Sequence, residues 1–358
     1  MTRPSYDAFL KYNPKLKRYA DALRNENTRA NYLVAIKLLV GDRPDKFLTL
    51  VEKDRKKAEF KLLDNLVEMK NRGLSGASIR GPFYALKGFL LFYELPLNWR
   101  KFHLAIPPSK KVANDRPPAK DEIRRLLDVC DLRTKVVVHL LASSGMRIGA
   151  FDFLCVGDFK EKESGIGALT VYRGDPEQYT AFISPEAVGY LKRYLDGRRK
   201  VGEDVNDKSP LIRDLWTHQN RKDKLDPSLA NRLPSKFIGK RLGEYWIKSG
   251  VRDRLQDGAR QEFQQAHGFR KFFNTQANQV IQRNDVEVLM GHMTNYYKPT
   301  DDYLAKAYLK AIPHLTISEV EELRKSNEKM KSVIDELENL KARLALVESG
   351  LEKEKTSQ

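Results

Sequence analysis

Apolar residues recur at helical spacing through most of the first hundred residues, and turn-forming residues separate the runs. The period is clearest after Thr28 and after Ser75, two residue types that can cap a helix N-terminus. Residues 1–104 are therefore predicted to form a helical domain. The apolar positions that follow the two caps are Tyr32, Ile36 and Leu39 in the first segment and Ile79, Phe83, Leu86 and Tyr93 in the second.

A linker and a second helical region follow. Residues 105–118 (AIPPSKKVANDRPP) combine four prolines with basic residues and have no apolar period, as linkers do. A second domain is expected to start near Ala119 with a helix over AKDEIRRLLDVCD. The next helix, TKVVVHLLASSG, is apolar, and Gly145 can terminate it.

The middle of this domain has a strand period instead. The segment ALTVYRGDPEQYTAFIS alternates apolar and polar residues around a Gly-Asp-Pro turn, which predicts a β-hairpin with strands near residues 168–172 and 179–184. Helical patterns then return to about residue 312, and the domain is placed at residues 119–315. The expected fold class is mainly α, with a small antiparallel β-hairpin or sheet in the second domain.

The last segment, residues 316–358, is rich in Glu and Lys and has an apolar residue at every seventh position. This repeat is typical of a coiled coil, and Asn327 at the other seam position can specify a two-stranded register. Lys341 and Glu348 weaken the seam, and a lone solvated helix or one folded back on its own domain remains an alternative. The favoured interpretation is a homo-oligomer that dimerises through these heptads. The seam residues are Leu323, Met330, Leu337, Leu344 and Leu351, with Val320, Asn327 and Ile334 at the second position.

Charge narrows the choice of partner. The chain of 358 residues contains 65 Lys and Arg against 48 Asp and Glu, a formal net charge of +17. Such an excess indicates a polyanionic partner, and double-stranded DNA is the first candidate. The basic side chains considered for DNA contact are Arg80, Lys87, Lys110, Lys111 and Lys271.

Other features of the composition favour a cytoplasmic protein. Cys130 and Cys155 lie in apolar surroundings, where buried free thiols are expected rather than a disulfide or a metal pair. No stretch approaches the ~18 uncharged apolar residues of a membrane span, and the first residues lack the apolar run of a secretory signal. We expect a DNA-associated protein with no membrane partner, no metal and no cofactor.

Three short segments carry residues suited to phosphate chemistry. They are SSGMRIGAFDFL around Arg147, AHGFRKFF around His267 and Arg270, and LMGHMTNYYKPTDDYL around His292. Each is common alone, since an Arg at a helix junction is usually solvated and a lone His is usually structural. In this order, behind a basic helical domain, they resemble the tyrosine recombinase (phage-integrase-like) family, with an ending that looks most like its archaeal members.

The resemblance covers the linker boundary, residues 119–315 and, more loosely, the N-terminal domain. It implies that Arg147 and Arg270 hold the non-bridging oxygens of a DNA phosphate, since guanidinium groups bind two such oxygens in a fork. His267 and His292 would donate further hydrogen bonds, and His267 could help to take the tyrosine proton. Attack by a tyrosine would give a covalent 3′-phosphotyrosine, from which the strand is rejoined without ATP.

The nucleophile is a choice between two tyrosines. Tyr296, Tyr297, Tyr303 and Tyr308 all follow His292. By resemblance the second tyrosine of Tyr-Tyr-Lys-Pro-Thr attacks, which favours Tyr297 and leaves Tyr303 as the rival. Tyr297 follows His292 by only five residues, which is shorter than usual in the family by about one helical turn.

Two positions depart from the family pattern. The family usually places a lysine on the hairpin to protonate the departing 5′ oxygen, but no lysine lies between Ala168 and Ser184. Arg173 stands at the turn instead and can stabilise the leaving oxygen without being an ordinary acid, while Lys160 and Lys162 are the alternatives. A second departure is Ala150, which stands where an acidic residue is common, so that nearby Asp152 is expected to orient the site.

The preferred hypothesis is a site-specific recombinase, an integrase or transposase-like enzyme of a mobile element, that assembles into a higher-order synaptic complex on DNA. A type IB topoisomerase would use the same chemistry as a monomer, and the heptads argue against it. The competing class is a DNA-binding accessory protein of the same fold with weak or no catalysis. A metal-dependent nuclease is a poorer candidate, because no cluster of spaced carboxylates or His and Cys ligands is present in the sequence.

Overall fold

The computed structural model describes residues 3–108, 115–214, 231–253, 262–292 and 296–318, together with Leu337. The chain divides into two compact units, Met1–Val112 and Ala113–Gln358. Each unit is considered by itself. Apart from Leu337, which is helical, the predicted heptad seam lies outside the described residues.

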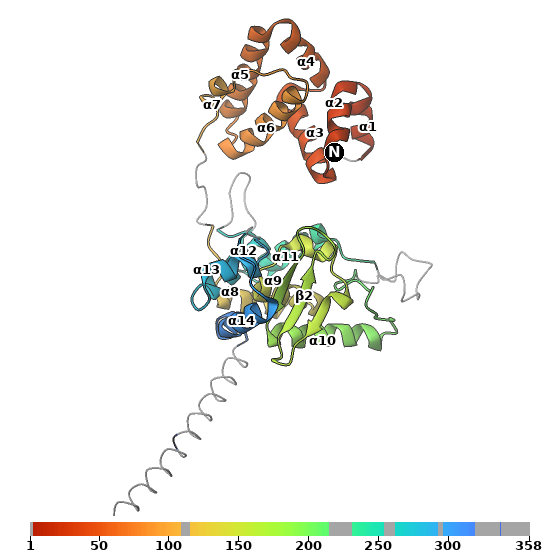
Figure 1. The fold of residues 1–358 in the computed structure, drawn as a ribbon, viewed down its shortest axis with the longest axis vertical. Coiled ribbons are helices and arrows are strands. Elements are labelled where there is room, and N and C mark those ends of the chain that lie inside the picture. The colour runs from red at the N-terminus through yellow and green to blue at the C-terminus, as the bar shows by residue number, and fades with distance from the viewer. Residues whose placement is uncertain are drawn as a thin grey trace, which may run out of the picture. The chain divides into compact units, whose positions relative to one another are not determined.

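The first unit is helical, as its apolar period predicts. Its core contains Leu16, Ile36 and Phe83, which are fully buried, and α3 packs closely against α6. The helices are α1 (Arg3–Lys11), α2 (Pro14–Ala22), α3 (Glu26–Val40), α4 (Pro44–Lys53), α5 (Arg55–Asn71), α6 (Gly76–Phe92) and α7 (Trp99–His103) (Figure 1).

Capping decides where two of these helices begin. Ser75 caps α6, since its side chain accepts a hydrogen bond from the backbone N–H of Ser78, as predicted. The prediction of Thr28 as a cap is wrong, because α3 begins two residues earlier. The Asn25 side chain accepts from the N–H groups of both Asn27 and Thr28, and so Thr28 lies inside the first turn.

The second unit combines helices with one antiparallel sheet of order β1-β2-β3, which confirms the predicted fold class. The predicted hairpin is β2–β3, in which Val171 pairs with Tyr179, and β1 is a strand that the sequence pattern did not indicate. The elements are α8 (Lys120–Val129), α9 (Leu132–Ser144), the 3-10 helices η1 (Ile148–Asp152) and η2 (Val156–Asp158), β1 (Phe159–Glu161), β2 (Gly167–Val171), β3 (Tyr179–Ile183), α10 (Pro185–Lys200), α11 (Ser235–Lys248), α12 (His267–Ala277), α13 (Arg283–Leu289) and α14 (Asp301–Leu315) (Figure 1).

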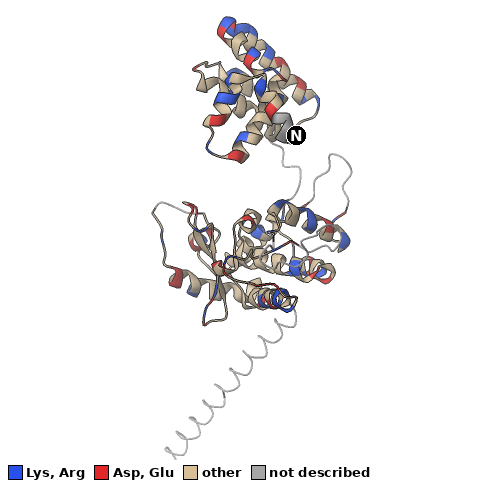
Figure 2. Ribbon diagram, turned by 90° about the vertical axis from the view of Figure 1, so that its right-hand side faces the viewer, with Lys and Arg blue, Asp and Glu red and all other residues tan. Residues whose placement is uncertain are grey.

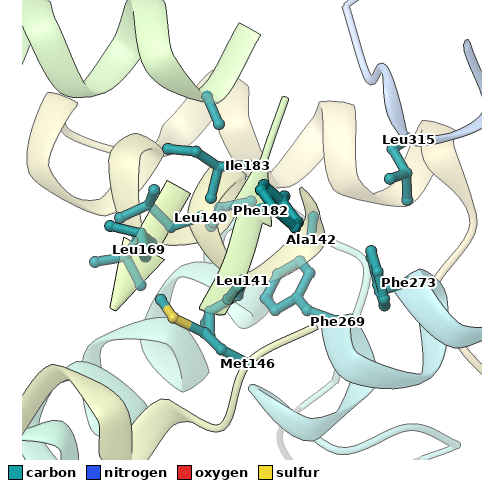
Figure 3. Packing of buried hydrophobic residues seen from close by; sticks show 14 of the residues in the cluster. Leu140, Leu141, Ala142, Met146, Leu169, Phe182, Ile183, Phe269, Phe273 and Leu315 are labelled. Atoms are coloured by element: carbon teal, nitrogen blue, oxygen red, sulfur yellow. The ribbon is translucent and has the colours of Figure 1, made fainter. Parts of the chain in front are cut away.

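Helix α9 is the centre of this unit and packs against α10, α12 and β3. Side chains from α9, α12 and the sheet meet in one apolar cluster, in which Leu141, Phe182 and Phe269 are almost completely buried (Figure 3). Burial of this kind contributes about 25 cal/mol per Å² of apolar surface, so the cluster fixes α12 firmly against α9. The helix that carries His267 and Arg270 is therefore held rigidly.

Gly145 ends α9 in the left-handed conformation, with φ 63°, as predicted for a terminating glycine. A Cβ at this position would lie 2.5 Å from the ring of Phe273 on α12. Glycine is therefore required twice, for its backbone angles and for the close approach of α12. The chain leaves α9 directly toward Arg147.

Other predicted features have mixed outcomes. Cys130 and Cys155 are both free thiols, but only Cys130 is buried, and burial raises its pKa to about 12. Over the described parts of the chain, no helix is long and apolar enough to cross a membrane. Lys and Arg are distributed over helices of both units (Figure 2).

Candidate active site

Arg270, on the second turn of α12, is the most firmly held residue of the candidate site. Its side chain is buried, and Nη1 donates to the backbone carbonyls of Gly145 at 2.7 Å and Met290 at 2.9 Å. Nη2 lies 2.7 Å from Nε2 of His292. Carbonyls from the ends of two other helices thus determine where this guanidinium points.

His292 completes a chain of hydrogen bonds behind Arg270. Its Nδ1 bonds to the carboxylate of Glu287 on α13, and its backbone N–H donates to the carbonyl of the same residue. Because a guanidinium can only donate, Nε2 of His292 accepts from Arg270 and Nδ1 carries the proton. In this arrangement His292 orients Arg270, and its Nε2 has no proton with which to bind a phosphate.

Arg147 stands at the exit from α9, one residue before η1, and its side chain is exposed. No other described residue bonds to its guanidinium by a hydrogen bond or ion pair. The pKa of Arg270 is lowered by burial and then by the charge of Arg147, so the two guanidinium groups are neighbours. Two like charges held together favour an anion between them. We call Arg147, Arg270 and His292 the arginine cluster.

His267 is the first residue of α12, one turn before Arg270, and is exposed. Burial lowers its pKa, and the positive charges of Lys271, Arg270 and Arg147 lower it further. His267 is therefore neutral at neutral pH and can accept a proton. The structure thus brings all four predicted His and Arg residues to one end of α12.

Two tyrosines of the β-hairpin also lie at this site, and neither was predicted from the sequence. Tyr172 follows the last residue of β2 and has φ 56°, and Tyr179 is the first residue of β3. The charges of Arg147 and Arg270 act on both hydroxyls, which places both tyrosines beside the arginine cluster. In the sequence both read as ordinary apolar strand positions, so only the pairing of the strands reveals them.

Gly291 explains how Tyr179 reaches the cluster. Gly291 has φ 78°, and a Cβ there would lie 2.5 Å from the Tyr179 ring. Glycine immediately before His292 therefore lets the ring of Tyr179 pack against the backbone of the segment that carries His292. In the Gly-His motif the glycine is therefore needed for packing, and the histidine for the proposed chemistry.

The two candidate nucleophiles bond to the same carboxylate. The Tyr297 hydroxyl donates to Oδ1 of Asp285, and the Tyr303 hydroxyl donates to Oδ2 of the same carboxylate at 3.1 Å. Asp285, in the first turn of α13, is 1% exposed. The hydrogen bond to Asp285 raises the pKa of Tyr297, since a phenolate beside a carboxylate is disfavoured. We call residues 296–303 the tyrosine segment.

The other two tyrosines differ sharply in exposure. Tyr296 is fully exposed, whereas Tyr308 on α14 is fully buried and donates to the carbonyl of Ser143 at 2.7 Å. Burial raises the pKa of Tyr308. Tyr308 is therefore part of the core, as the sequence reading expected for most of these tyrosines.

Two of the three residues considered for the missing hairpin lysine are engaged elsewhere. Arg173 bonds to the carboxylate of Asp158 and, at 3.0 Å, to the carbonyl of Gly157. Lys162 lies 3.3 Å from the carboxylate of Asp302 on α14, and Lys160 is exposed on β1.

The expectation that Asp152 orients the site is not met. Both of its carboxylate oxygens accept from Ser235, at 2.7 Å from the backbone N–H and 2.6 Å from the hydroxyl. Asp152 therefore caps α11, and it makes no hydrogen bond to Arg147. Ala150 is completely buried, where an unpaired acidic side chain would be unfavourable.

The basic residues predicted to bind DNA have varied surroundings. Lys271 on α12 is paired with Asp115, whose backbone carbonyl accepts from it at 2.9 Å. On α6, Lys87 lies over the Trp99 ring at 5.4 Å, and Arg80 is half-buried. Lys110 and Lys111 lie outside the described residues.

Comparisons with known proteins support the fold. No protein-family model and no curated protein matches this sequence. A lambda integrase dimer bound to a COC′ core site aligns with TM-score 0.50 and 16% identity, over 86% of this chain and 81% of that chain. A lambda integrase (75–356) dimer on the same kind of site aligns with TM-score 0.50 and 15% identity, over 80% and 98% of the two chains.

A transposon integrase is also similar. The Tn1549 integrase in complex with transposon right end DNA aligns with TM-score 0.49 and 16% identity, over 82% of this chain and 98% of that chain. At these identities the likeness concerns the fold. The chain has the mainly helical architecture, with a small antiparallel sheet, of the tyrosine recombinase catalytic domain.

Proposed function

We propose that this protein is a site-specific DNA recombinase that breaks and rejoins strands through a covalent 3′-phosphotyrosine. The observation that supports this most is the arginine cluster, in which a buried, carbonyl-anchored Arg270 lies beside Arg147, whose guanidinium has no partner among the described residues. Such a pair holds two non-bridging oxygens of a phosphodiester and stabilises the charge that develops on them. The net charge of +17 supports double-stranded DNA as the carrier of that phosphate.

Each residue of the site has a distinct part in the proposed reaction. Arg147 and Arg270 bind the phosphate, His292 orients Arg270, and neutral His267 accepts a proton during the attack. Tyr297 is the nucleophile and Tyr303 the alternative. Since both hydroxyls bond to Asp285, the attacking tyrosine must exchange this carboxylate for the phosphate before it reacts.

The lambda and Tn1549 integrase structures are complexes with DNA, and the lambda integrase is a dimer. We propose that this chain likewise binds duplex DNA, and that protomers associate through the heptads of residues 316–358. Removing residues 318–358 should lower the oligomeric state in light scattering, because the seam would be lost. An unchanged oligomeric state would exclude the heptads as the oligomerisation element.

The decisive experiment uses nicked suicide substrates made from the ends of the element that encodes the protein. Loss of the short fragment after the nick prevents rejoining, so a covalent protein–DNA band accumulates. The Tyr297→Phe variant should give no band, whereas Tyr303→Phe should keep it. The reverse pattern would make Tyr303 the nucleophile, and no band with the unmodified protein on cognate DNA would favour the accessory DNA-binding protein.

A type IB topoisomerase would use the same chemistry on any supercoiled DNA. Relaxation of plasmids without a cognate site separates the two activities, since a recombinase requires paired sites. We expect no such relaxation.

A further inference from the structure

Strand cleavage as proposed above requires a proton that the arginine cluster does not supply. When the tyrosine oxygen bonds to phosphorus, the bond to the 5′ oxygen breaks and its electron pair stays on that oxygen. An alkoxide is a strong base and a poor leaving group, so a general acid must protonate it. The following inference rests on the proposed function and concerns the identity of this acid.

Four basic groups near the site are unsuited to act as acids. Arg147 and Arg270 hold their protons too tightly. Arg173 is tied to Asp158, and Lys162 lies beside Phe182 and Asp302. Phe182 follows Tyr179 by three residues on β3, so Lys162 is at the far end of the strand from the cluster.

Tyr179 has the geometry that these groups lack. It is 8% exposed and begins β3, next to the hairpin turn, with its ring packed against Gly291. Its hydroxyl lies beside the Arg270 guanidinium and finds no hydrogen-bond acceptor among the described residues. A buried hydroxyl without an acceptor is unfavourable, and an oxygen of bound DNA would accept its hydrogen bond.

The protonation state of Tyr179 suits an acid. Burial raises its pKa to about 12, so the hydroxyl carries its proton at neutral pH. Arg270 and Arg147 oppose that rise, because their charges stabilise the phenolate that remains after the proton has left. Tyr172, the other hairpin tyrosine, is only half-buried and contacts Phe153 edge to face.

We propose that Tyr179 is the general acid that protonates the departing 5′ oxygen. The bond from the nucleophilic tyrosine to phosphorus forms and the bond from phosphorus to the 5′ oxygen breaks. The Tyr179 proton moves to the 5′ oxygen, and a phenolate remains beside Arg270. In rejoining, the phenolate takes the proton back from the 5′ hydroxyl, so the cycle consumes nothing.

The test compares two cleavage substrates that differ in one atom. In one, the scissile 5′ oxygen is replaced by sulfur, which leaves as a thiolate without protonation because a thiol is far more acidic than an alcohol. On the oxygen substrate, Tyr179→Phe should cleave about 10²-fold more slowly than the unmodified protein. On the sulfur substrate, the cleavage rates of Tyr179→Phe and of the unmodified protein should agree within about threefold, because no acid is needed.

Each contrary outcome is informative. An equal loss on both substrates, or no loss on either, would overturn the assignment, since a positioning role does not depend on the leaving atom. Tyr172→Phe is the matched control, and a sulfur-dependent rescue of that variant instead would move the acid to Tyr172. If the unmodified protein forms no adduct on either substrate, the proposed function itself fails, which is a different result.

A second variant guards against misfolding of the first. Tyrosine fluorinated on its ring at position 179 keeps its shape and has a lower phenol pKa. Because an acid must be protonated to act, the fall of the cleavage rate toward alkaline pH should begin at lower pH than in the unmodified protein. An unchanged pH profile would overturn the proposal.

Discussion

The arginine cluster and the tyrosine segment lie in the same unit but are held by different bonds. Backbone carbonyls of Gly145 and Met290 hold Arg270, and these belong to helix ends that the apolar core fixes in place. The two tyrosine hydroxyls are held by one carboxylate, that of Asp285. The difference teaches that the proposed phosphate-binding residues are fixed by the fold, whereas the candidate nucleophiles keep a bond that they can exchange.

This contrast has a physical basis. A hydrogen bond to a charged group contributes about 1.5–3 kcal/mol, and two carbonyls plus His292 share the guanidinium of Arg270. Moving Arg270 would break all three contacts and disturb α12. Moving Tyr297 breaks its bond to Asp285, for which water or a phosphate can substitute.

The largest expected effect comes from comparing Arg147→Ala with Arg270→Ala. Both should lower single-turnover cleavage by about 10³-fold, because each removes a donor to the developing phosphate charge. Only Arg270→Ala should also lower the thermal midpoint, since two buried carbonyls lose their donor at about 1–3 kcal/mol each. Kinetics on suicide substrates and thermal denaturation measure the two quantities.

Arg147→Ala serves as the control for stability in that pair. If both variants unfolded at the same lowered temperature, Arg147 would have a structural role that its exposed side chain does not suggest. If neither variant lost cleavage, the arginine cluster would not be the phosphate site.

His267 is expected to impose a pH dependence on cleavage. Its pKa is lowered below the ordinary value of about 6.5, so it is neutral at neutral pH and becomes protonated only in acid. The rate should therefore be constant near neutral pH and fall as pH decreases through the lowered pKa. His267→Asn should be about 10²-fold slower and should lack this acid limb.

The contrary result for His267 is equally clear. A rate that rises on acidification would mean that protonated His267 acts as a donor, and that another group takes the tyrosine proton. An acid limb that persists in His267→Asn would assign the titration to a different residue.

Asp285→Asn tests the tyrosine segment with a smaller effect. An amide removes the negative charge, so the pKa of Tyr297 should fall toward its ordinary value. NMR of tyrosine labelled at Cζ reports that titration directly. Since a neutral partner releases the hydroxyl more easily, cleavage should change by no more than about tenfold.

Glu287→Gln is the matched control for Asp285→Asn, because it neutralises the other α13 carboxylate of the site. It should leave the Tyr297 pKa unchanged. A Tyr297 pKa that stays raised in Asp285→Asn would show that the carboxylate is not its cause.

The smallest effect is expected for Arg173→Ala. Because Arg173 bonds to Asp158 and to the carbonyl of Gly157, its loss should weaken the hairpin turn slightly. Cleavage should stay within about threefold of the unmodified protein. If Arg173→Ala instead cleaved the oxygen substrate about 10²-fold more slowly and recovered on the sulfur substrate, Arg173 would be the residue that stabilises the leaving oxygen.

Local signals in the sequence predicted much of the fold correctly. Ser75 caps α6 and Gly145 ends α9, since each depends on the backbone of its own few neighbours. The hairpin was predicted from the alternation of apolar and polar residues, and the prediction was correct for β2 and β3. The strand β1 was missed, because three residues are too few to show a period.

The site divides in the same way. The motifs around Arg147, His267, Arg270 and His292 could be recognised because the resemblance to a family depends on residue types and on their order along the chain, both of which the sequence contains. No such signal marked Asp285 as the shared partner of Tyr297 and Tyr303. Asp152 lies close to Arg147 in the sequence and was therefore expected to orient the site, but its carboxylate accepts hydrogen bonds from Ser235 instead.

By itself, then, the sequence determined the helices, the hairpin, the basic charge and the identities of the residues that can bind a phosphate, since these follow from neighbours along the chain. Only the tertiary structure decided that Arg270 is fixed by carbonyls from two other helix ends, that Tyr179 reaches the cluster across Gly291, and that both candidate nucleophiles bond to one carboxylate. Such contacts join positions far apart in the sequence, and they exist only once the apolar core has packed α9, α12 and the sheet together.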